Sequence, residues 1–324
     1  MFLDASKAFD RVNHWLLFKK RIDRKVPLFI VRLLCFWYTN QKMNVKWGAA
    51  ISNTFSVHNG VKQGGILSPL LFCVYMDDLA VKLNNSGIGC HYGGRTLNHF
   101  SYADDMSLVA PSPGGLRKLI AICEQYARDH DIIYNSEKSV CMLIHSKKVK
   151  FSKLPVITLL DKQMKYVDSY KYLGCFISAD LSDDLDVDRQ RRVICMNANR
   201  LSRQFHKCSE EVKIKLFRTY CSNMYCSQLW CNYRNSVMQK LKVTYHNAMR
   251  WLCNLPSNCS ASNMLVSRDL PSFEALRRKY IYGFVLRLDA CNNSIIKNLS
   301  TVHWYFTGGL GPEVVRTLYT VTGT

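Results

Sequence analysis

Two adjacent aspartates, Asp104 and Asp105, lie inside an otherwise apolar stretch that reads HFSYADDMSLVA from residue 99 to residue 110. The stretch has no helical period, so it predicts a short, largely buried β-hairpin with the two carboxylates at its tip. Two ionised carboxylates repel each other, and apolar surroundings disfavour both charges unless a cation compensates them. We therefore expect the fold to bring a divalent metal or a basic group to this tip.

A second pair, Asp77 and Asp78, provides an internal comparison. It lies in an apolar segment expected to be helical over residues 68–85, with Ser68 as the N-cap and Pro69 at the first helical position. Neighbouring residues on a helix point about 100° apart. We interpret this second pair as solvated surface charges, whereas a two-residue hairpin turn would let the first pair approach a third group on a neighbouring strand.

The composition is that of a globular protein with an anionic partner. The chain has 324 residues, 48% of them hydrophobic, which is enough for a substantial core and two domains. Its net charge is +20, and residues 189–287 contain 18 Lys and Arg against 4 Asp and Glu, a balance of +14. A generally basic surface is one explanation, but the concentration of charge in one segment favours a nucleic acid.

Neither the cysteines nor the apolar segments indicate secretion. The fourteen cysteines are scattered through apolar segments of a long chain, which predicts mostly reduced, buried thiols. On the expected helix, the five-residue spacing of Cys221, Cys226 and Cys231 would rotate successive thiols by about 140°, so we do not expect a shared zinc ion. No apolar run reaches the roughly 18 residues of a membrane span and the N-terminus lacks a signal-peptide pattern, which predicts no membrane partner and a cytoplasmic or nuclear location.

Two kinds of pattern divide the chain. Residues 1–178 alternate β-prone runs with helical segments, which predicts an α+β domain with an antiparallel sheet and packed helices. After an acidic bend at residues 180–188, the remainder of residues 179–290 has apolar residues at helical spacing with Lys or Arg between them, which predicts a basic helical bundle. Residues 291–324 form a weakly patterned tail.

The individual elements follow from the same periodicities. The expected helices are residues 9–22, 27–38, 68–85, 115–131, 189–206, 210–233, 236–253 and 272–290. The expected strands are residues 1–4, 43–47, 55–58, 140–145, 156–160 and 172–177, with the aspartate hairpin between the third and fourth helices.

Several stretches, in a fixed order, resemble a known family. FLDASKAFDRVNH (2–14), GVKQGGILSPLLF (60–72) and YADD (102–105) resemble the palm motifs of reverse transcriptases from LINE-type non-LTR retrotransposons. NSEKS (135–139) and YKYLG (170–174) fall where that family has its later palm motifs, and KLFRTYCSNMYCSQLW (215–230) resembles its thumb region more weakly. The resemblance implies a right-hand polymerase palm over residues 1–178, followed by a thumb-like helical region.

The resemblance also implies a two-metal active site. Asp4 and Asp104 match the family's metal-binding carboxylates, and Asp105 matches the third acidic residue. Two Mg²⁺ ions, with Mn²⁺ as a substitute, would activate the attacking oxygen and stabilise the leaving group. Lys138 matches a lysine proposed to protonate the pyrophosphate leaving group, although a solvated charge is the alternative.

Three further residues match the nucleotide-binding positions of the family. Phe9 matches an aromatic steric gate that excludes the ribose 2′-hydroxyl, with a core phenylalanine as the alternative. Gln63 and Gly64 match a loop that packs against the incoming nucleotide and template, with an ordinary turn as the alternative. Asp10 is assigned to a helix-terminal charge instead, because a carboxylate near a helix N-terminus is favourable.

The expected function is RNA-directed DNA polymerisation, in which dNMP is transferred from dNTP to a DNA primer 3′-hydroxyl on an RNA template. Tyr172, Leu173 and Gly174 match the hairpin that grips the primer end, and an ordinary core strand is the alternative. A two-metal nuclease would also use three aspartates but would not need the Phe9 position or the glycine-rich turn.

The family's palm is preceded by a fingers region whose basic residues bind the triphosphate. This chain begins inside the first aspartate motif, so we expect it to be truncated at its N-terminus, with the fingers largely missing. The alternative function is therefore a catalytically inactive nucleic-acid-binding remnant of a retrotransposon. The sequence leaves open whether a separate polypeptide supplies the fingers, as well as the template and target-site specificity and the oligomeric state.

Overall fold

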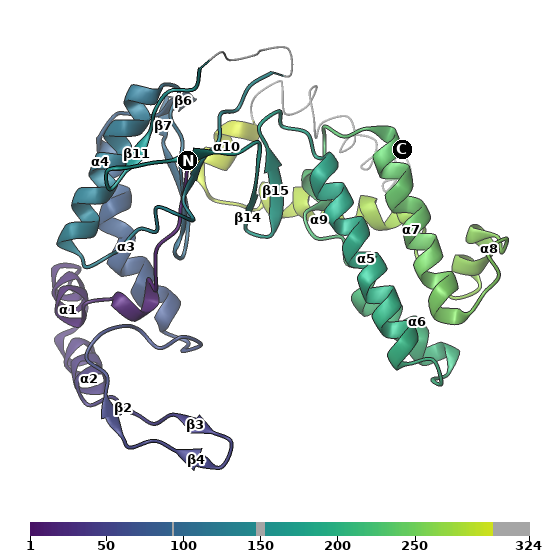
Figure 1. Cartoon of the computed structure of the whole chain (residues 1–324), viewed down its shortest axis with the longest axis horizontal. Coiled ribbons are helices and arrows are strands. Elements are labelled where there is room, and N and C mark those ends of the chain that lie inside the picture. The colour runs from purple at the N-terminus through teal and green to yellow at the C-terminus, as the bar shows by residue number, and fades with distance from the viewer. Residues whose placement is uncertain (93, 147–152, 301–324) are drawn as a thin grey trace. The chain divides into compact units, whose positions relative to one another are not determined.

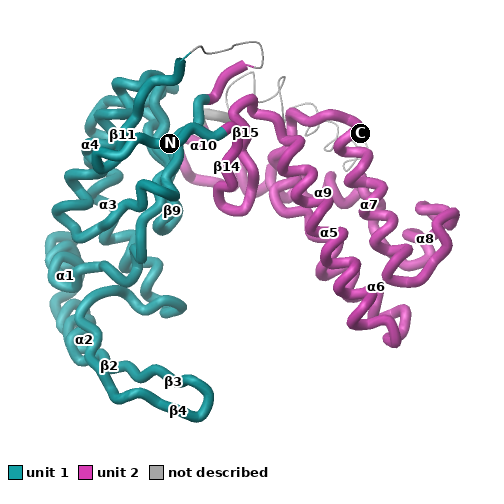
Figure 2. Tube along the Cα trace, viewed as in Figure 1, with its two compact units in different colours: residues 1–143, 149–167 teal, residues 144–148, 168–324 magenta. Residues whose placement is uncertain are grey.

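The structure is a computed structural model that describes residues 1–92, 94–146 and 153–300 (Figure 1). The chain divides into two compact units, residues 1–143 with 149–167 and residues 144–148 with 168–324 (Figure 2). The hairpin of β14 (Ser169–Tyr172) and β15 (Cys175–Ser178) belongs to the second of these units, because β15 contacts helix α5 (Asp184–Gln204). The predicted domain over residues 1–178 thus contains the first unit and this hairpin.

The first unit is built around a five-stranded sheet. The strand order is β13 (Lys165–Tyr166), β10 (Val140–Cys141), β1 (Phe2–Leu3), β9 (Asp105–Leu108) and β8 (His99–Tyr102). Strand β1 is central and antiparallel to both neighbours, while β13 pairs with β10 in parallel. The mixture of sheet and helices confirms the predicted α+β class, and the parallel edge pair departs from a purely antiparallel sheet.

Helices α3 (Ser68–Asn85) and α4 (Pro113–Asp129) lie together on one side of this sheet (Figure 1). Leu3, Met106 and Leu108 point into the core that the helices form. Because successive side chains on a strand point to opposite faces, Phe2 and Ser107 face away from the helices. The sheet therefore has a helix-covered face and an opposite face.

The predicted helix over residues 9–22 is interrupted. A 3₁₀ turn, η1 (Phe9–Arg11), precedes α1 (His14–Asp23), and the break lies at Val12 and Asn13. The Asn13 side-chain oxygen accepts hydrogen bonds from the backbone N–H groups of Trp15 and Leu16 and so caps α1. The next helix, α2 (Leu28–Thr39), forms as predicted.

Two details predicted for α3 were wrong. Ser68 is not the N-cap; Leu67 holds that position, and the Ser68 hydroxyl donates to the carbonyl of Lys62 at 2.5 Å. Asp77 and Asp78 are also not merely solvated, because both form ion pairs. Gly87, at φ +65°, follows the end of the helix as expected.

Ion pairs with α1 hold the Asp77-Asp78 pair. Arg24 Nη2 lies 2.5 Å from Asp77 Oδ2, and Lys20 Nζ pairs with Asp78 Oδ2. Burial acts to raise the pKa of Asp78, but the hydrogen bond and charge of Lys20 outweigh it and lower that pKa. These aspartates therefore join α1 to α3.

Short hairpins complete the first unit. The predicted hairpin after α2 is present, with β2 (Lys42–Met43) paired to β5 (Phe55–Ser56) and β3 (Lys46–Trp47) paired to β4 (Ala50–Ile51) nearer its tip. Two further hairpins are β6 (Cys90–Tyr92) with β7 (Arg95–Leu97) and β11 (Thr158–Leu159) with β12 (Lys162–Gln163). The pair β6–β7 was not predicted.

The second unit is mainly helical, which confirms the predicted pattern. After α5 come α6 (Glu210–Tyr220), η2 (Ser227–Leu229), α7 (Asn235–Cys253), α8 (Ala261–Val266), α9 (Phe273–Asp289) and α10 (Ser294–Ser300). Among the described residues, no helix combines the length and the apolar character that crossing a membrane would require. Within the expected tail, residues 301–324 lie outside the described part of the chain.

Two expectations about this unit were wrong. The acidic bend over residues 180–188 is half helix, because α5 already begins at Asp184, where a carboxylate in the first turn is favourable. The helix expected over residues 210–233 ends at Tyr220. Phe217, Cys221 and Met224 are all buried and follow one another at the helical spacing i, i+4, i+7, so the pattern imitates a continued helix although the helix ends at Tyr220.

Candidate active site

Antiparallel pairing brings Asp4 and Asp105 together in the first unit. Asp4 follows β1, Asp105 begins β9, and the register pairs Leu3 with Met106. The next step of that register sets Asp4 opposite Asp105. Opposed residues have Cβ atoms about 4.5–5.5 Å apart and share a face of the sheet. Since Leu3 and Met106 point into the core, the two carboxylates face away from the helices.

The hairpin places its two aspartates differently. Tyr102 pairs with Asp105, so the two-residue turn consists of Ala103 and Asp104, and Ala103 has φ +53°. The prediction that both carboxylates lie at the tip is therefore correct only for Asp104. Asp105 is held in the strand, whereas Asp104 lines a small, mostly apolar cavity together with Phe72 and other residues of α3.

The three carboxylates affect one another electrostatically. Burial raises the pKa of Asp105, and the negative charges of Asp104 and then Asp4 raise it further. Each ionised neighbour makes a further negative charge at Asp105 less favourable. A bound cation would remove this penalty. A cation at these aspartates is what the sequence pattern led us to expect.

The donor chemistry fits a divalent ion, although the described residues contain no ready-made group of three or more His, Cys, Asp or Glu side chains arranged to hold a metal. Mg²⁺ does not need such a cage. It commonly binds through one or two carboxylates and completes its octahedron with water and substrate phosphates. Carboxylate oxygens of Asp4, Asp104 and Asp105 are the hard ligands that this ion prefers.

Replacing Asp105 by Asn should stabilise the metal-free chain at neutral pH. Because the pKa of Asp105 is raised above 3.8 in the folded chain, folding favours the protonated form, and stability falls as the pH rises through the interval above 3.8. An Asn side chain carries no charge, so the variant does not lose this stability as the pH rises. We expect a gain of about 0.2–1 kcal/mol, the range for opposed cross-strand charges, visible as a higher melting temperature by differential scanning fluorimetry at pH 7.

The matched control for this measurement is Asp10→Asn. Asp10 is exposed in η1, not in α1 as first expected, so its replacement removes a carboxylate of the same motif without removing the repulsion. The advantage of Asp105→Asn should shrink toward pH 4, where wild-type Asp105 becomes protonated. A variant that melts below wild type at pH 7 would contradict the repulsion.

The NSEKS loop holds the backbone of Asp4 from both sides. The Asp4 N–H donates to Ser139 Oγ at 3.1 Å, and the Asp4 carbonyl accepts the Asn135 N–H at 2.8 Å. The Asn135 side-chain oxygen in turn accepts the Lys138 N–H at 3.2 Å, and the Lys138 side chain is exposed. Sequence reasoning singled out Lys138 but missed Ser139, which is buried, and Asn135. The recurrence of Ser and Asn in one turn-like motif was the available signal.

Phe9 lies in η1, where its ring stacks on Phe72 of α3 with centroids 4.6 Å apart and planes inclined by 16°. The ring is half-buried against the core, and the Phe9 carbonyl accepts the Val61 N–H at 2.7 Å. This contact joins the first aspartate motif to the glycine-containing loop. Phe72 also lines the cavity at Asp104, so one side chain contacts both regions.

Gly60 sets the close contact between the first motif and the loop. Its φ is +91°, and a Cβ atom there would lie 2.8 Å from the carbonyl oxygen of Asp10. Its own carbonyl accepts a hydrogen bond from Nε2 of the buried His14 at 2.7 Å. No residue with a side chain fits this position without moving the backbone.

Gln63 and Gly64 lie in a tight turn after Gly60. The Gly65 N–H donates to the Lys62 carbonyl at 2.9 Å, and Gly64, the third residue of the turn, has φ +80°. Gln63 is exposed, and the space where Gly64 would carry a Cβ atom is open. An exposed turn with an open backbone position can accept a ligand.

In the second unit, Tyr172, Leu173 and Gly174 form the end of a hairpin. Tyr172 pairs with Cys175, and the turn residues Leu173 and Gly174 have φ +47° and +85°. The strand expected over residues 172–177 is therefore two strands joined by a turn of the kind that needs positive φ at both central residues. Leu173 adopts this conformation at a cost of order 1–3 kcal/mol, so the surrounding structure must hold it.

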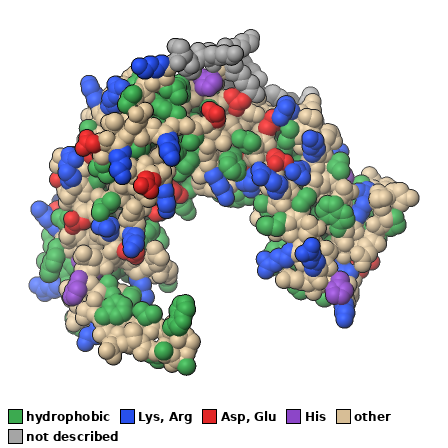
Figure 3. Space-filling view, in the orientation of Figure 1, with side chains coloured by type: hydrophobic (Ala, Val, Ile, Leu, Met, Phe, Trp, Pro, Cys, Tyr) green, Lys and Arg blue, Asp and Glu red, His purple; other side chains and the backbone are tan. Residues whose placement is uncertain are grey.

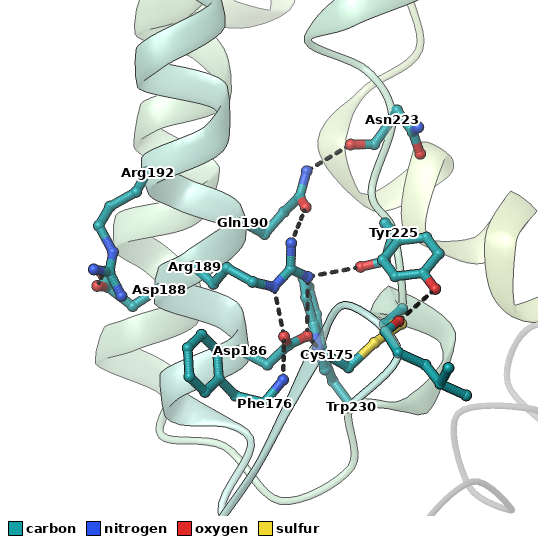
Figure 4. A network of polar contacts seen from close by, with 12 residues as sticks. Cys175, Phe176, Asp186, Asp188, Arg189, Gln190, Arg192, Asn223, Tyr225 and Trp230 are labelled. Atoms are coloured by element: carbon teal, nitrogen blue, oxygen red, sulfur yellow. Dashed lines mark hydrogen bonds and ion pairs between the residues drawn. A yellow bond between two sulfur atoms is a disulfide. The ribbon is translucent and has the colours of Figure 1, made fainter. Parts of the chain in front are cut away.

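Tyr225 supplies part of that support. Its hydroxyl donates to the Leu173 carbonyl at 2.8 Å, and its ring would lie 3.0 Å from a Cβ atom on Gly174 (Figure 4). A disulfide between Cys175 and Cys226, with Cα atoms 6.6 Å apart, joins the same two segments. The hairpin end is thus fixed to the loop after α6.

The carboxylate of Asp186 is the centre of the polar network in Figure 4. The side chain is buried and accepts the Phe176 N–H at 3.0 Å and the Trp230 Nε1–H at 2.8 Å. Arg189 Nε lies 2.6 Å from Asp186 Oδ1, and the same guanidinium donates to the Tyr225 carbonyl at 3.1 Å. This one carboxylate therefore ties α5 to β15 and to Trp230 after η2, while its partner Arg189 reaches Tyr225 before η2. Sequence reasoning missed it, because it reads as one more acidic residue of the expected bend.

Cys221, Cys226 and Cys231 do not lie on the single helix that was expected to carry them. Cys221 is buried at the end of α6, Cys226 is in the disulfide with φ +68°, and Cys231 is exposed. The expected rotation of about 140° between successive thiols on one helix therefore does not apply to these cysteines. The other twelve cysteines carry thiols, but only Cys123, Cys141 and Cys221 are buried, so the expectation that most thiols are buried was wrong.

Exposed cations are spread over the helices of the second unit, as the Lys and Arg side chains around α5 and α6 in Figure 3 illustrate. Those on α5, α6 and the neighbouring loops include Arg192, Arg200, Arg203, Lys207, Lys215 and Arg218. A surface with this balance suits the phosphate backbone of a nucleic acid.

Comparison with known proteins gives this arrangement a family. Residues 1–177 match the family described as reverse transcriptase (RNA-dependent DNA polymerase). The chain belongs to the reverse transcriptase family. The match covers more than half of the chain and contains every motif on which the resemblance rested, apart from the weaker thumb-like stretch.

Relatives in curated collections carry the names of mobile elements. A Pol polyprotein from the type-1 retrotransposable element R2 of Popillia japonica is 29% identical over 188 residues, which are 55% of this chain and 30% of that protein. The RNA-directed DNA polymerase from mobile element jockey of Drosophila funebris is 22% identical over 311 residues, 92% of this chain and 33% of that protein. These names confirm the resemblance to retrotransposon reverse transcriptases. The chain spans about a third of the length of these relatives.

One solved structure similar to this chain is that of a telomerase from Candida albicans in complex with a fragment of telomeric RNA. The similarity covers 98% of this chain and 49% of the telomerase chain. The TM-score is 0.32 and the identity 12%, so no property of the telomerase is transferred to this reverse transcriptase chain.

Proposed function

We propose that this chain forms the palm and thumb of an RNA-directed DNA polymerase that extends a DNA primer with dNTPs on an RNA template. The observation that carries the proposal is the register that sets Asp4 opposite Asp105, with Asp104 in the adjoining turn. All three carboxylates belong to one unit, and their mutual repulsion favours a bound cation.

In this proposal the chain's own residues position the reacting groups. Two Mg²⁺ or Mn²⁺ ions held by Asp4, Asp104 and Asp105 would supply positive charge to the attacking 3′-hydroxyl oxygen and to the leaving pyrophosphate. Ser139 and Asn135 fix the Asp4 backbone, and Lys138 on the same loop supplies a cation for the leaving group.

The residues proposed to bind the nucleotide, the primer and the duplex keep the roles that the family resemblance implied. The turn at Gln63 and Gly64 accepts the incoming nucleotide, and the hairpin end at Tyr172, Leu173 and Gly174 holds the primer. The basic helices of the second unit, as the thumb, bind the phosphates of the RNA–DNA duplex. The first unit with this hairpin then corresponds to the palm over residues 1–178, and residues 179–290 to the thumb and connection region.

Phe9→Ala should reduce discrimination against ribonucleotides. If the Phe9 ring occupies the space of a ribose 2′-hydroxyl, its removal opens that space, and the preference for dNTP over NTP should fall by about 10- to 100-fold. Single-nucleotide primer extension with each nucleotide type measures the ratio of kcat/KM values. Phe72→Ala is the comparison, because it also breaks the stacked pair but removes the other ring. Equal discrimination in wild type and Phe9→Ala would assign Phe9 to the core alone.

The decisive test of the proposal is primer extension by the purified 324-residue chain on an RNA template with Mg²⁺. Metal-dependent extension would establish the polymerase. A folded chain that binds the template–primer without extending it would favour the alternative, an inactive nucleic-acid-binding remnant, for which the basic helices alone suffice.

A further inference from the structure

The hairpin formed by β2 to β5 presents a tryptophan at its tip without covering it. Trp47 is 86% exposed, and every other residue from 44 to 56 is exposed as well. Val45, Ile51 and Phe55 on the same hairpin are also about half exposed or more. Hydrophobic side chains gather on this end of the first unit in Figure 3, and no Asp or Glu is visible on it in that view.

Side-chain hydrogen bonds keep the hairpin ordered although it packs against little else. Asn44 Nδ2 donates to the Ser52 carbonyl at 3.0 Å and to Thr54 Oγ1 at 2.9 Å. The Val45 N–H donates to Ser52 Oγ at 2.9 Å. These contacts bridge the two strands between the pairs β2–β5 and β3–β4, so the tip is a preformed surface whose binding requires little ordering.

The charge around this tip is of one sign. Between Asp23 and Asp77 the sequence has no acidic residue, while it contains six Lys or Arg: Arg24, Lys25, Arg32, Lys42, Lys46 and Lys62. Lys42 and Lys46 belong to the hairpin itself, and both are exposed. An exposed aromatic ring that follows two lysines on the same arm of the hairpin, with no carboxylate nearby in the sequence, is complementary to a stacked base and its neighbouring phosphates.

We infer that the tip of this hairpin binds single-stranded nucleic acid, with a base stacked on Trp47 and phosphates bound by Lys42 and Lys46. The inference rests on the proposed function only in taking the bound strand to be the unpaired part of the RNA template. A nucleic acid matches the hairpin better than a protein partner does, because Lys42 and Lys46 are the only charged residues between positions 42 and 56.

The test is a titration of a fluorescein-labelled, mixed-sequence single-stranded RNA with the full chain, followed by anisotropy in EDTA and without dNTP. Trp47→Ala should weaken binding by roughly 5- to 100-fold, the range for loss of one stacked base, while Trp47→Phe should keep most of the affinity. Trp15→Ala is the matched control, since Trp15 on α1 is 73% exposed and should leave binding unchanged.

A second measurement examines the lysines. Replacing Lys42 and Lys46 together by Ala should flatten the dependence of log affinity on log salt by up to about 1.4, because each phosphate contact on a single strand contributes about 0.7. Equal affinity of wild type and Trp47→Ala would overturn the inference. The inference would also be overturned if Trp47→Ala changed the oligomeric state in analytical ultracentrifugation but left RNA affinity unchanged, because the tip would then bind a second copy of the chain.

The two proposals fail separately. If wild type never extends a primer but loses RNA affinity on Trp47→Ala, the inference stands and the polymerase proposal fails. If wild type extends a primer and Trp47→Ala changes neither single-strand affinity nor the KM for template, the polymerase stands and the inference is wrong.

Discussion

Asp104→Asn should reduce primer extension on an RNA template by about 10²–10³-fold or more, while binding of the template–primer is retained. The variant keeps the size of the side chain but removes the negative charge that, in the proposed function, would hold a divalent ion at the turn between β8 and β9. Loss of one group that stabilises developing charge in a transition state has a cost of this size. Single-turnover extension at saturating dNTP, with Mg²⁺ titrated, measures the effect.

The second Asp-Asp pair provides the control for this prediction. Asp77→Asn also removes one carboxylate from an Asp-Asp pair, but Asp77 is held by Arg24 in an ion pair whose side chains are both about one third to one half exposed. Such a pair contributes at most about 1 kcal/mol, so extension should stay within a few-fold of wild type. Equal losses in the two variants would mean that the effect of Asp104→Asn comes from general destabilisation.

Asp186→Ala should lower the free energy of unfolding of the second unit by about 3–5 kcal/mol. The substitution leaves the largely buried guanidinium of Arg189 without its carboxylate partner and deprives the Trp230 indole N–H and the Phe176 N–H of their acceptor. Breaking a buried ion pair by removing one partner has this cost, because the remaining charge is buried and uncompensated. Urea unfolding followed by circular dichroism measures it, and limited proteolysis locates it.

Asp188→Ala, two residues further along α5, is the matched control. Asp188 pairs with Arg191 and Arg192, but all three side chains are at least one third exposed. We expect a loss below about 1 kcal/mol. Early proteolytic cleavage of Asp186→Ala should fall near β15 and near Tyr225 and Trp230 on either side of η2, the segments that Asp186 and Arg189 join. If both variants lose the same small amount, the network does not hold these segments together.

Much of the local structure could be predicted from the sequence, because local periodicity reports which face of an element is buried. The aspartate hairpin, helix α3 and the basic helical half all followed from patterns within a few residues, although the hairpin turn and the N-cap of α3 each lie one residue earlier than expected. The errors have local causes as well. Asn13 caps α1 where a continuous helix was expected, and buried Cys221 and Met224 imitate a helical period in a segment that turns.

The sequence by itself determined the family and the order of its motifs, because these depend on residue identity alone. Only the tertiary structure decided that Asp4 lies opposite Asp105, that Ser139 holds the Asp4 backbone, and that Asp186 is buried while Asp188 is not. Strand register and burial of a charge depend on partners far along the chain, whose positions are set by packing rather than by local pattern. That is why the carboxylates could be identified from sequence, whereas the groups that position them could not.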